Sequence, residues 1–503
     1  MDFLKTVRVS PIFLILNLAL SVIYFICIVS FFPIGNPVLF GLLVVSEIFH
    51  LWQVVGYLHS VWPYKREKQF DPEFQPDVGV FITVCGEPTD IVEETVQAAL
   101  AMDYPKHSIY ILNDGFVANR DNWEEAEELA KKYNITCITR RKPGGAKAGN
   151  INNALRQTKE DFVVIFDADH VPKPELLKEM MGYFVDEKVA FVQSPQYYKN
   201  HSENMVTGGA WDQQALFFGA IMQGKDNSNT AFMCGTNMIL RRTALIEAGG
   251  MSEFSIAEDF LTSLLIHEKG GKSVYVGRVL AEGLAPEDFL SYYKQQFRWA
   301  RGSLEVVFKF NPLFRKGLSM AQRLQYLSSS SFYLSGLIVL LNAVMPLIYF
   351  FTAIEPLTID TMTLALVFLP YIFLVLYTIQ LTSNFSYTFR ALSFSLSSWP
   401  IHVKAVWQII IGKKSGFVVT SKKKVSGNHG YLVTPHLVYI GLVIVGIIVG
   451  IFREGVSPAI ITNAVWAAIY IAIFLPFINA AFEKDGSKQI IENTPVLKEG
   501  KAA

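Results

Sequence analysis

Six apolar runs long enough to cross a membrane limit most strongly how this chain folds. An α-helix needs roughly twenty apolar residues to span the hydrocarbon core of a bilayer, and 51% of the 503 residues are hydrophobic. The runs cover residues 12–32, 38–61, 326–352, 362–383, 436–452 and 458–481. They leave a long polar region between the second and the third run. The sequence therefore predicts a multi-pass membrane protein with a large domain outside the bilayer.

Basic residues predict the side of the membrane on which this domain lies, because segments rich in Lys and Arg stay in the cytosol. Lys5 and Arg8 precede the first run, and seven basic residues lie between the fourth and fifth runs. The loops at 33–37 and 353–361, on the opposite side, contain none. The first run is no cleaved signal peptide, because a second run follows at once without a small-residue cleavage site. We expect a plasma-membrane protein with both termini and the large domain in the cytosol.

Charge and cysteine usage argue against two classes of function. The 44 Lys and Arg residues are balanced by 44 Asp and Glu residues, so no excess of positive charge favours nucleic acid as a partner. The four cysteines, at 27, 85, 137 and 234, are widely separated and form no CxxC pair. This spacing fits a reducing compartment and predicts neither a disulfide framework nor a zinc site.

The region between the second and third runs alternates β-rich and helical segments. Strands are expected at 78–85, 109–114, 135–140, 162–169 and 189–194, and helices at 90–102, 122–133, 147–157 and 173–185. Such alternation predicts an α/β domain with a mostly parallel sheet covered by helices. In open sheets of this kind, ligands bind beyond the carboxyl ends of the strands.

Acidic residues stand at the ends of two predicted strands and at the start of a later helix. Asp114 ends the second strand, and Asp167 and Asp169 end the fourth. Because residues i and i+2 of an extended chain share a face, the last two are expected to converge on one hard cation. The alternative is an acidic turn, since Asp is common where strands end. Glu258 and Asp259 open an amphipathic helix, where acidic residues also suit the helix dipole.

The segment KQQFRWARGS, residues 294–303, lies just before the third apolar run. Gln295, Arg298 and Trp299 follow the spacing i, i+3, i+4, so a helix presents an amide, a cation and a large aromatic ring on one face. This face is able to bind a polar ligand that also has an apolar surface. The alternative is an interfacial amphipathic helix, in which Trp and Arg are common.

The order of these features resembles the processive family 2 glycosyltransferases, the group of cellulose, curdlan and hyaluronan synthases. The signature of that family is a strand-end Asp, DxD, [T]ED and Q(Q/R)xRW, and it reads here as Asp114, DAD at 167–169, AED at 257–259 and QQFRW at 295–299. Three further stretches resemble the cellulose synthase branch: KAGNINNAL at 147–155, FMCGTNMILRR at 232–242 and FVVTSKK at 417–423, the last being similar to the gating loop. The resemblance runs from about residue 78 to residue 424.

The resemblance implies an α/β domain of the GT-A glycosyltransferase fold, inserted in an α-helical membrane domain of about six transmembrane helices. It divides the chain into two transmembrane helices in 1–65, the GT-A domain in 66–285, interfacial helices with the QxxRW motif in 286–325, two transmembrane helices in 326–383, an interfacial helix and the gating loop in 384–435, two transmembrane helices in 436–481 and a short cytosolic tail in 482–503.

The resemblance also implies a reaction. The chain is expected to polymerise glucose from UDP-glucose into a cellulose-like β-glucan, with inversion, and to extrude the polymer through its own channel. Asp259 is the expected general base, with Glu258 as the next candidate, and Asp167 and Asp169 are expected to hold Mg²⁺ or Mn²⁺. Substrate binding is expected from Thr83, Glu87, Asp114, Lys147, Asp167, Cys234, Gln295, Arg298, Trp299, Phe417, Val419, Thr420 and Lys422.

The implied partners are the UDP-sugar, the growing polysaccharide and the lipid bilayer; accessory subunits leave no readable signal in the sequence. Alternative functions are synthesis of another β-glycan (a β-1,3 or mixed-linkage glucan, or a hyaluronan-like polymer), a non-processive transfer of sugar to a lipid phosphate, and a transporter with a nucleotide-binding domain. Glu47 and His50, one turn apart in the second run, are expected either to contact the polymer or to pair with each other.

The sequence departs from the family pattern at three points. Asn113 precedes Asp114 where the family commonly has a second Asp, and Ala257 replaces the usual Thr before the ED pair. No cyclic-dinucleotide-binding PilZ domain follows the last run, so cyclic di-GMP is expected neither to bind nor to stimulate. None of these departures removes a residue to which the chemistry is assigned.

Overall fold

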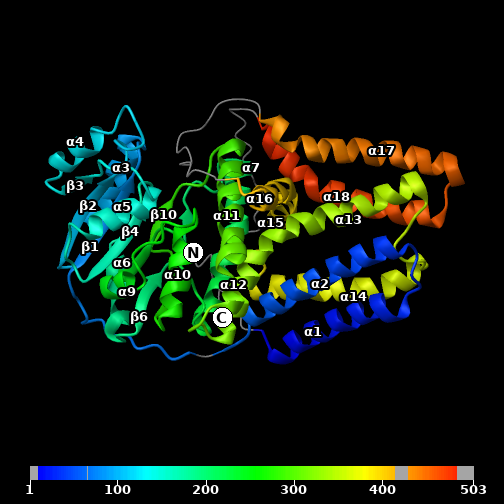
Figure 1. Ribbon diagram of the computed structural model, residues 1–503, viewed down its shortest axis with the longest axis horizontal. Coiled ribbons are helices and arrows are strands. Elements are labelled where there is room, and N and C mark those ends of the chain that lie inside the picture. The colour runs from blue at the N-terminus through cyan, green and yellow to red at the C-terminus, as the bar shows by residue number, and fades with distance from the viewer. Residues whose placement is uncertain (1–8, 65, 414–428, 484–503) are drawn as a thin grey trace, which may run out of the picture.

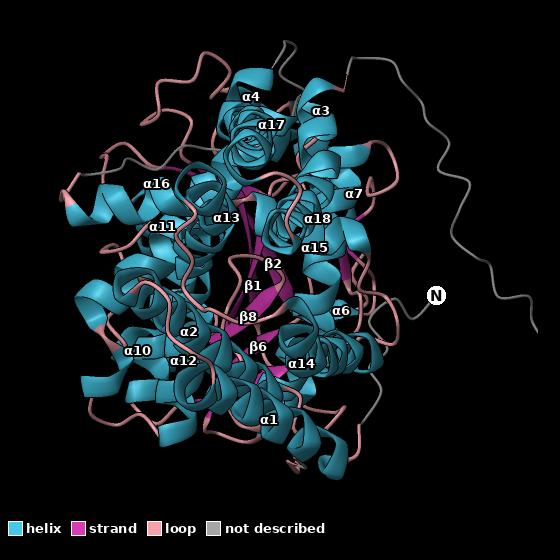
Figure 2. Cartoon of the chain, turned by 90° about the vertical axis from the view of Figure 1, so that its right-hand side faces the viewer, coloured by secondary structure: helices cyan, strands magenta, loops and turns pink. Residues whose placement is uncertain are grey.

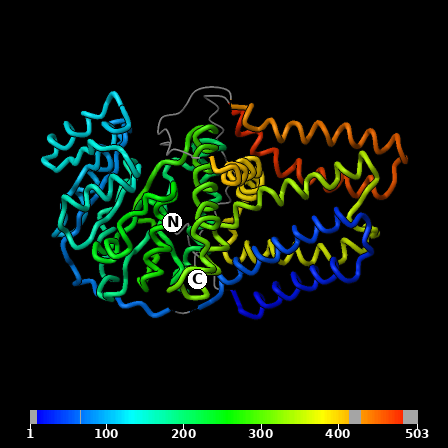
Figure 3. The backbone as a smooth tube through the Cα atoms, in the orientation of Figure 1, coloured from blue at the N-terminus to red at the C-terminus, as the bar shows by residue number. Residues whose placement is uncertain are grey.

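The protein is divided between an α/β domain and a bundle of long helices, which lie at opposite ends of the molecule (Figure 1). A computed structural model describes residues 9–64, 66–413 and 429–483. The helix α11, Phe289–Phe310, stands between the two parts and crosses the direction of the bundle helices. The segment that follows α2 (Pro37–Ser60) runs along one edge of the molecule into the first strand (Figure 3). The domain is therefore attached to the bundle through both of its ends.

Six helical segments in the described part of the chain are long and apolar enough to cross a membrane. They are Pro11–Phe31, Pro37–Ser60, Met320–Thr352, Thr361–Thr382, Gly430–Glu454 and Pro458–Phe482. All six predicted runs are confirmed. The third begins six residues earlier than predicted, because Ser319 and Gln322 form a capping box that starts a helix ahead of the apolar run.

The bundle helices lie roughly parallel when viewed from their own end of the molecule (Figure 2). Their bounds are α1 Pro11–Ile26, α2 Pro37–Ser60, α12 Met320–Ser331, α13 Ser335–Thr352, α14 Thr361–Thr382, α17 Thr434–Glu454 and α18 Pro458–Phe482. Within α2, His50 Nδ1 lies 3.4 Å from Glu47 Oε2, and the Tyr24 hydroxyl donates to Glu47 Oε1 at 3.5 Å. The mutual pairing expected of Glu47 and His50 is present, and a contact with the polymer stays a prediction.

The α/β domain contains a seven-stranded sheet in the order β3-β2-β1-β4-β8-β6-β9. The strands are β1 Val78–Val84, β2 His107–Asn113, β3 Thr136–Thr139, β4 Phe162–Asp167, β6 Val189–Gln193, β8 Met238–Arg241 and β9 Lys272–Tyr275. Only β8 runs antiparallel to its neighbours, so the sheet is mixed but mostly parallel. All five predicted strands are present, and β8 and β9 are additional.

Helices cover both faces of this sheet, as expected for alternating strands and helices. One face packs on α3 (Thr89–Leu100), α4 (Glu125–Lys132) and α6 (Leu176–Met181), and the other on α5 (Ala146–Leu155), α9 (Arg242–Glu247) and α10 (Glu258–Glu268). A small sheet of β5 (Val171–Pro172), β10 (Ala281–Gly283) and β7 (Tyr197–Tyr198) lies beside it. In the register of the large sheet, Thr83 pairs with Asp167 and Val84 with Asn113. The carboxyl ends of β1, β2 and β4 thus meet at one edge.

One continuous apolar core joins the α/β domain to the bundle. It packs α7 (Met205–Leu216), α10 and α11 against α13, α17 and α18. Where the sequence predicts a single interfacial helix in 384–435, the structure shows two, α15 (Phe389–Ser397) and α16 (Trp399–Ile410). The prediction was wrong because Pro400 sits in the first turn of α16, where proline is favoured and ends the preceding helix. The predicted gating-loop residues Phe417, Val419, Thr420 and Lys422 lie outside the described residues.

Candidate functional site

A cavity of about 540 Å³ opens at the carboxyl ends of β1, β2 and β4 and is closed on the opposite side by α11. Every predicted site residue within the described part of the chain lines it: Thr83, Glu87, Asp114, Lys147, Asp167, Asp169, Cys234, Glu258, Asp259, Gln295, Arg298 and Trp299. These residues come from elements up to about two hundred positions apart in the sequence. The structure therefore brings the predicted residues together around one cavity.

The turn after β4 places two carboxylates and an imidazole close together. β4 ends at Asp167, and Ala168 and Asp169 form a turn that the backbone N–H of His170 closes by donating to the Asp167 carbonyl at 3.0 Å. One ligand atom from each of Asp167, Asp169 and His170 lies within 4.8 Å of the others. The expected convergence is present, but its expected cause, a strand extending through Asp169, is wrong. A turn brings the two side chains together instead.

This group of side chains fits a divalent cation. Two carboxylates and an imidazole are ligands for hard and borderline divalent ions. Asp169 is buried, with its Oδ2 accepting from the backbone N–H of Leu284 at 3.2 Å, while the more accessible Asp167 lies at the cavity wall. Asp167 Oδ1 also lies 3.4 Å from Thr83 Oγ1, on the neighbouring strand. His170 was not predicted, although it follows the DAD motif directly.

Lys147 brings a positive charge to the same carboxylates. It begins the first turn of α5, and its ammonium pairs with Asp167 and donates to the Gly235 carbonyl at 2.7 Å. Burial acts to lower the pKa of Lys147, but the nearby charges of Asp167, Glu258 and Asp259 outweigh it and leave the pKa raised. Lys147 is therefore a fixed cation at the floor of the cavity, able to share its charge with an anionic ligand.

Asp114 forms an ion pair with Arg140, a residue that was not predicted to belong to the site. Arg140, just after β3, donates through Nε to Asp114 Oδ1 at 2.7 Å and through Nη2 to Asp114 Oδ2 at 2.6 Å. Burial raises the pKa of Asp114, and this ion pair opposes the shift. Arg140 also donates to the carbonyls of Gly144 and Ala146, so it fixes the turn that leads into Lys147. The sequence signal that could have identified Arg140 is its position, as a basic residue at the end of the strand next to Asp114.

Glu258 and Asp259 are the first two residues of α10. Both line the cavity at a position where the dielectric constant is low. Glu258 is only 8% exposed, whereas Asp259 is more accessible from the cavity. Burial and the adjacent charge of Glu258 raise the pKa of Asp259 to about 7. A carboxyl group with a pKa near neutrality is suited to take up a proton and to release it.

Two glycines allow the chain to pass close to these acids. Gly235 has a φ of +85°, and a Cβ there would lie 3.2 Å from Asp259 Oδ2, so the FMCGTN backbone runs directly over the carboxylate. A Cβ at Gly302 would lie 2.6 Å from the Cβ of Ala257, so α11 approaches the start of α10 closely. The Ala at 257, a departure from the family pattern, therefore occupies a tightly packed helix crossing.

The predicted face of α11 points into the cavity. Gln295, Arg298 and Trp299 all line it, as the i, i+3, i+4 spacing requires. The Gln295 side chain is 8% exposed, and its Oε1 has no hydrogen-bond partner among the described residues. A buried acceptor without a partner is costly, so this oxygen is placed to accept from a hydroxyl group of a ligand.

Cys234 lies beside this face with its thiol in the cavity wall. Burial, with a smaller contribution from the charge of Asp259, raises the pKa of the Cys234 thiol well above its ordinary value. Its backbone N–H donates to Gln193 Oε1 at 2.8 Å, and Gln196 Nε2 donates to its carbonyl at 2.5 Å. A protonated thiol is a weak nucleophile, so Cys234 is suited to contact a ligand and not to form a covalent intermediate.

Two sequence families match this chain in overlapping segments. The family described as "Glycosyltransferase like family 2" matches residues 76–302, and the family described as "Cellulose synthase" matches residues 247–479. The first match covers the sheet and most of α11, and the second runs from the end of α9 almost to the end of α18. Together the two matches contain every described residue of the cavity.

Curated relatives are named cellulose synthase catalytic subunits [UDP-forming]. One from Pseudomonas fluorescens is 31% identical over 427 residues, which is 82% of this chain and 57% of the relative. One from Xanthomonas axonopodis is 36% identical over 293 residues, 56% of this chain and 39% of the relative. A cellulose synthase 1 catalytic subunit from Komagataeibacter xylinus is 28% identical over 471 residues, 89% of this chain and 62% of the relative. The chain thus spans about half the length of these relatives.

A solved structure shares the fold at low sequence identity. It is a mannosyltransferase from Pyrobaculum calidifontis in complex with GDP-Man and Mn²⁺, with a TM-score of 0.51 and 16% identity. The alignment covers 75% of this chain and all of that protein. At this identity the similarity carries the fold alone.

Proposed function

We propose that this chain is a family 2 glycosyltransferase of the cellulose synthase group, and that it is a membrane-embedded, processive, inverting β-glycosyltransferase that polymerises glucose from UDP-glucose. Its α/β domain has the GT-A fold. One observation carries the proposal: the DAD carboxylates, the Glu258–Asp259 pair and the QxxRW face of α11 line a single cavity. The polymer leaves through the bundle of transmembrane helices, to which α11 is packed.

The donor occupies the part of the cavity at the strand ends. Uridine lies against Thr83, Glu87 and Asp114, on the side of β1 and β2, while the diphosphate lies toward Lys147 and Arg298. Asp167 and Asp169 would hold Mg²⁺ or Mn²⁺, which would supply positive charge to the departing UDP. Lys147 adds a point charge, and the guanidinium of Arg298 a forked pair of donors.

Asp259 acts as the general base for the acceptor sugar. Its carboxylate takes the proton of the acceptor hydroxyl, whose oxygen forms a bond to C1 of glucose while the bond from C1 to the phosphate oxygen breaks and UDP leaves. A single displacement inverts the configuration at C1, so the α-linked donor gives a β-linked product. Gln295 accepts a hydrogen bond from an acceptor hydroxyl through its buried Oε1, and Trp299 stacks on the terminal sugar ring.

We propose that the reaction takes place on the cytosolic side of the membrane. The basic residues beside the transmembrane segments favour a cytosolic catalytic domain with cytosolic termini, and the polymer then crosses the cell membrane away from its site of synthesis. The partners are accordingly the UDP-sugar, the growing polysaccharide and the lipid bilayer. α11 contributes to the lining of the cavity and stands between the α/β domain and the transmembrane helices (Figure 1).

The pH dependence of the reaction should report the titration of Asp259. A general base works only when deprotonated, and burial with the adjacent Glu258 raises the pKa of Asp259 to about 7. The rate should therefore be full above about pH 7 and fall as the pH drops, by about tenfold per unit well below the pKa. Initial rates of UDP release at saturating Mg²⁺ measure this profile.

The variant Glu258→Gln tests the cause of that profile. Removing the neighbouring negative charge should lower the pKa of Asp259 and move the acid limb toward lower pH. A wild-type rate that stays constant down to pH 5 would contradict a base with a raised pKa.

Replacing Trp299 by Ala should shorten the product. Loss of a stacking contact worth about 1–3 kcal/mol, by analogy with other rings on aromatic side chains, should weaken retention of the growing end by one to two orders of magnitude. UDP binding should persist, because the proposed nucleotide contacts do not include Trp299. The variant should yield free glucose or very short chains, and Trp299→Phe should recover part of the activity.

Product length and specific activity, measured together on purified protein, test this prediction. The control is Trp407→Ala on α16, whose side chain is 61% exposed and does not line the cavity. Polymer of normal length, made at a normal rate by Trp299→Ala, would make Trp299 an interfacial anchor and defeat its assignment to the acceptor.

A further inference from the structure

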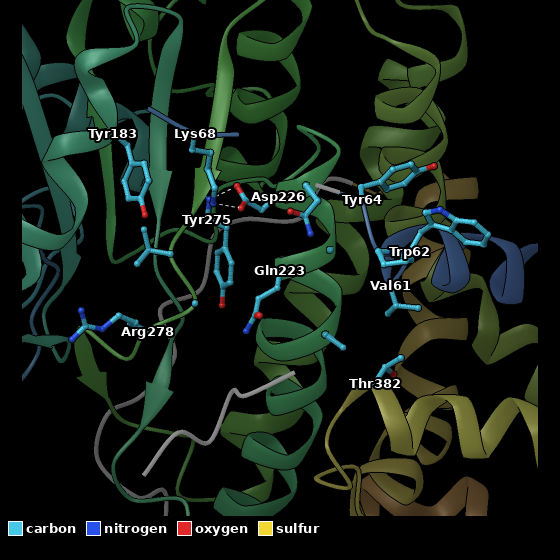
Figure 4. Close-up of a pocket in the computed structure, with 16 residues that line it drawn as sticks. Val61, Trp62, Tyr64, Lys68, Tyr183, Gln223, Asp226, Tyr275, Arg278 and Thr382 are labelled. Carbon is cyan, nitrogen blue, oxygen red and sulfur yellow. Dashed lines mark hydrogen bonds and ion pairs between the residues drawn. The ribbon is translucent and has the colours of Figure 1, made fainter. Parts of the chain in front are cut away.

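A second cavity, of about 450 Å³, lies where the catalytic domain meets the ends of two transmembrane helices (Figure 4). It shares no lining residue with the first cavity. Its lining comes from the segment after α2, from the end of α14, from α8 (Met222–Asn227) and from the residues after β9. The cavity is therefore bounded by both parts of the molecule, at the level where the transmembrane helices end.

The wall that belongs to the catalytic domain is polar and charged. Lys68 forms an ion pair with Asp226, and its ammonium lies 5.6 Å from the centre of the Tyr183 ring. Arg278 extends from the same wall, pairs with Glu179 at 2.5 Å and has 55% of its side chain exposed. Among the described lining residues, two cations thus stand against one carboxylate.

The opposite wall is apolar and aromatic, and it belongs to the membrane helices. Val61, Trp62, Pro63 and Tyr64 follow the last residue of α2, and Thr382 is the last residue of α14. Figure 4 shows Trp62 and Tyr64 on the side of the membrane helices, across from Tyr183 and Lys68. Trp and Tyr are the residues that favour the boundary between lipid and water. The cavity therefore has one wall suited to a charged head group and one suited to acyl chains.

The two walls are held at a fixed distance by close packing. A Cβ on Gly224 would lie 1.3 Å from the carbonyl oxygen of Ser60, so α8 lies directly against the end of α2. The Tyr57 hydroxyl and Thr382 Oγ1 are 2.5 Å apart, which joins α2 to the end of α14. The side chains beside these two contacts do not fill the space between the two walls. The cavity is therefore part of the junction between the α/β domain and the membrane helices.

We propose that this cavity binds a phospholipid from the membrane leaflet next to the catalytic domain. The phosphodiester lies against Lys68 and Arg278, because an ammonium and a guanidinium give charge-assisted hydrogen bonds to phosphate. Lys68 has three N–H donors and Arg278 has five, so their pairs with Asp226 and Glu179 leave donors for the phosphate. The glycerol and the acyl chains extend along Val61 and Trp62 toward the bilayer. The assignment does not depend on the reaction in the first cavity.

Photoreactive phospholipid tests the proposal on the full-length protein reconstituted in phosphatidylcholine vesicles. Cross-links should map to residues 61–64 and 220–227. The double variant Lys68→Met/Asp226→Asn removes the central ion pair without leaving one charge buried alone. The amide oxygen that replaces Asp226 Oδ1 still accepts from the backbone N–H of Tyr275. Labelling of these segments should fall by about tenfold, the size expected for loss of a charged hydrogen bond, and UDP binding should not change.

The matched control is Lys178→Met/Asp103→Asn, which removes an exposed ion pair of the same domain that does not line the cavity. Its labelling should equal that of the wild type. Should the first double variant not purify as a single species, Arg278→Gln, on a half-exposed side chain, serves in its place, with Arg278→Lys restoring part of the labelling. Equal labelling of wild type and variants would overturn the proposal. Displacement of the lipid by millimolar glycerol 3-phosphate, with the same dependence on Lys68, would assign the site to a soluble phosphate ester.

Discussion

Replacing Asp259 by Asn should leave UDP binding intact and lower the rate of sugar transfer by about 10²–10⁴-fold, the range for loss of a general base. An amide of the same shape keeps the packing at the start of α10 but cannot accept the proton of the acceptor hydroxyl. Asp259 is the better candidate of the acidic pair, because Glu258 is 8% exposed, whereas Asp259 is only partly buried. The loss should therefore appear in turnover and not in donor affinity.

Titration of UDP and initial rates of polymer formation, on the same purified protein, separate these two quantities. Glu258→Gln should reduce the rate much less than Asp259→Asn. Glu247→Gln, on an exposed side chain at the end of α9, should leave the rate unchanged and serves as the control for an acid-to-amide change. A near-normal rate in Asp259→Asn, with a large loss in Glu258→Gln, would transfer the role of base to Glu258.

Removal of divalent cations should abolish transfer altogether. In the proposed reaction, Lys147 and Arg298 would counter the negative charge on departing UDP, but these cations already face Asp167, Glu258 and Asp259. The protein alone thus brings at least as many negative as positive groups to the site, and a bound cation must supply the difference. EDTA should stop the reaction, and Mg²⁺ or Mn²⁺ should restore it.

Two single variants test whether the loss of activity without divalent cations arises from the DAD turn. Asp169→Asn should weaken binding of Mn²⁺, followed by its electron paramagnetic resonance signal, together with activity. Asp161→Asn, an exposed residue just before the opposite end of β4, should change neither. Full activity in EDTA, or tight Mn²⁺ binding by Asp169→Asn, would contradict the assignment of the metal to this turn.

The elements that the sequence predicted best are those with a single strong signal. β1 and β4 are apolar except for Thr83 and Asp167 near their carboxyl ends, because both of their faces are covered by helices, and such runs are readable as buried strands. By contrast, α7 was not predicted. Nine of its twelve residues are buried, and it includes two glycines, so it has no polar face and no helical period in its hydrophobicity. The short antiparallel β8 was missed for a similar reason, since four residues give no usable alternation.

The site shows the same division between local and tertiary signals. The face formed by Gln295, Arg298 and Trp299 follows from helical spacing alone, and the structure places all three in the cavity. The ion pair between Asp114 and Arg140 depends on β2 and β3 being neighbours, which no local pattern specifies. The resemblance located the acidic motifs correctly in the chain. It could not say that a turn after β4, in place of an extended strand, brings Asp167 and Asp169 together.

The central claim, that this protein polymerises glucose from UDP-glucose, is tested most directly by analysing its product. The purified, reconstituted protein is incubated with each UDP-sugar in turn and Mg²⁺, and the product is sized and its linkages determined. We expect a long glucan from UDP-glucose alone, with β linkages that a cellulase cleaves, and no product in EDTA. A single sugar attached to lipid, or a polymer formed only from a different UDP-sugar, would contradict it.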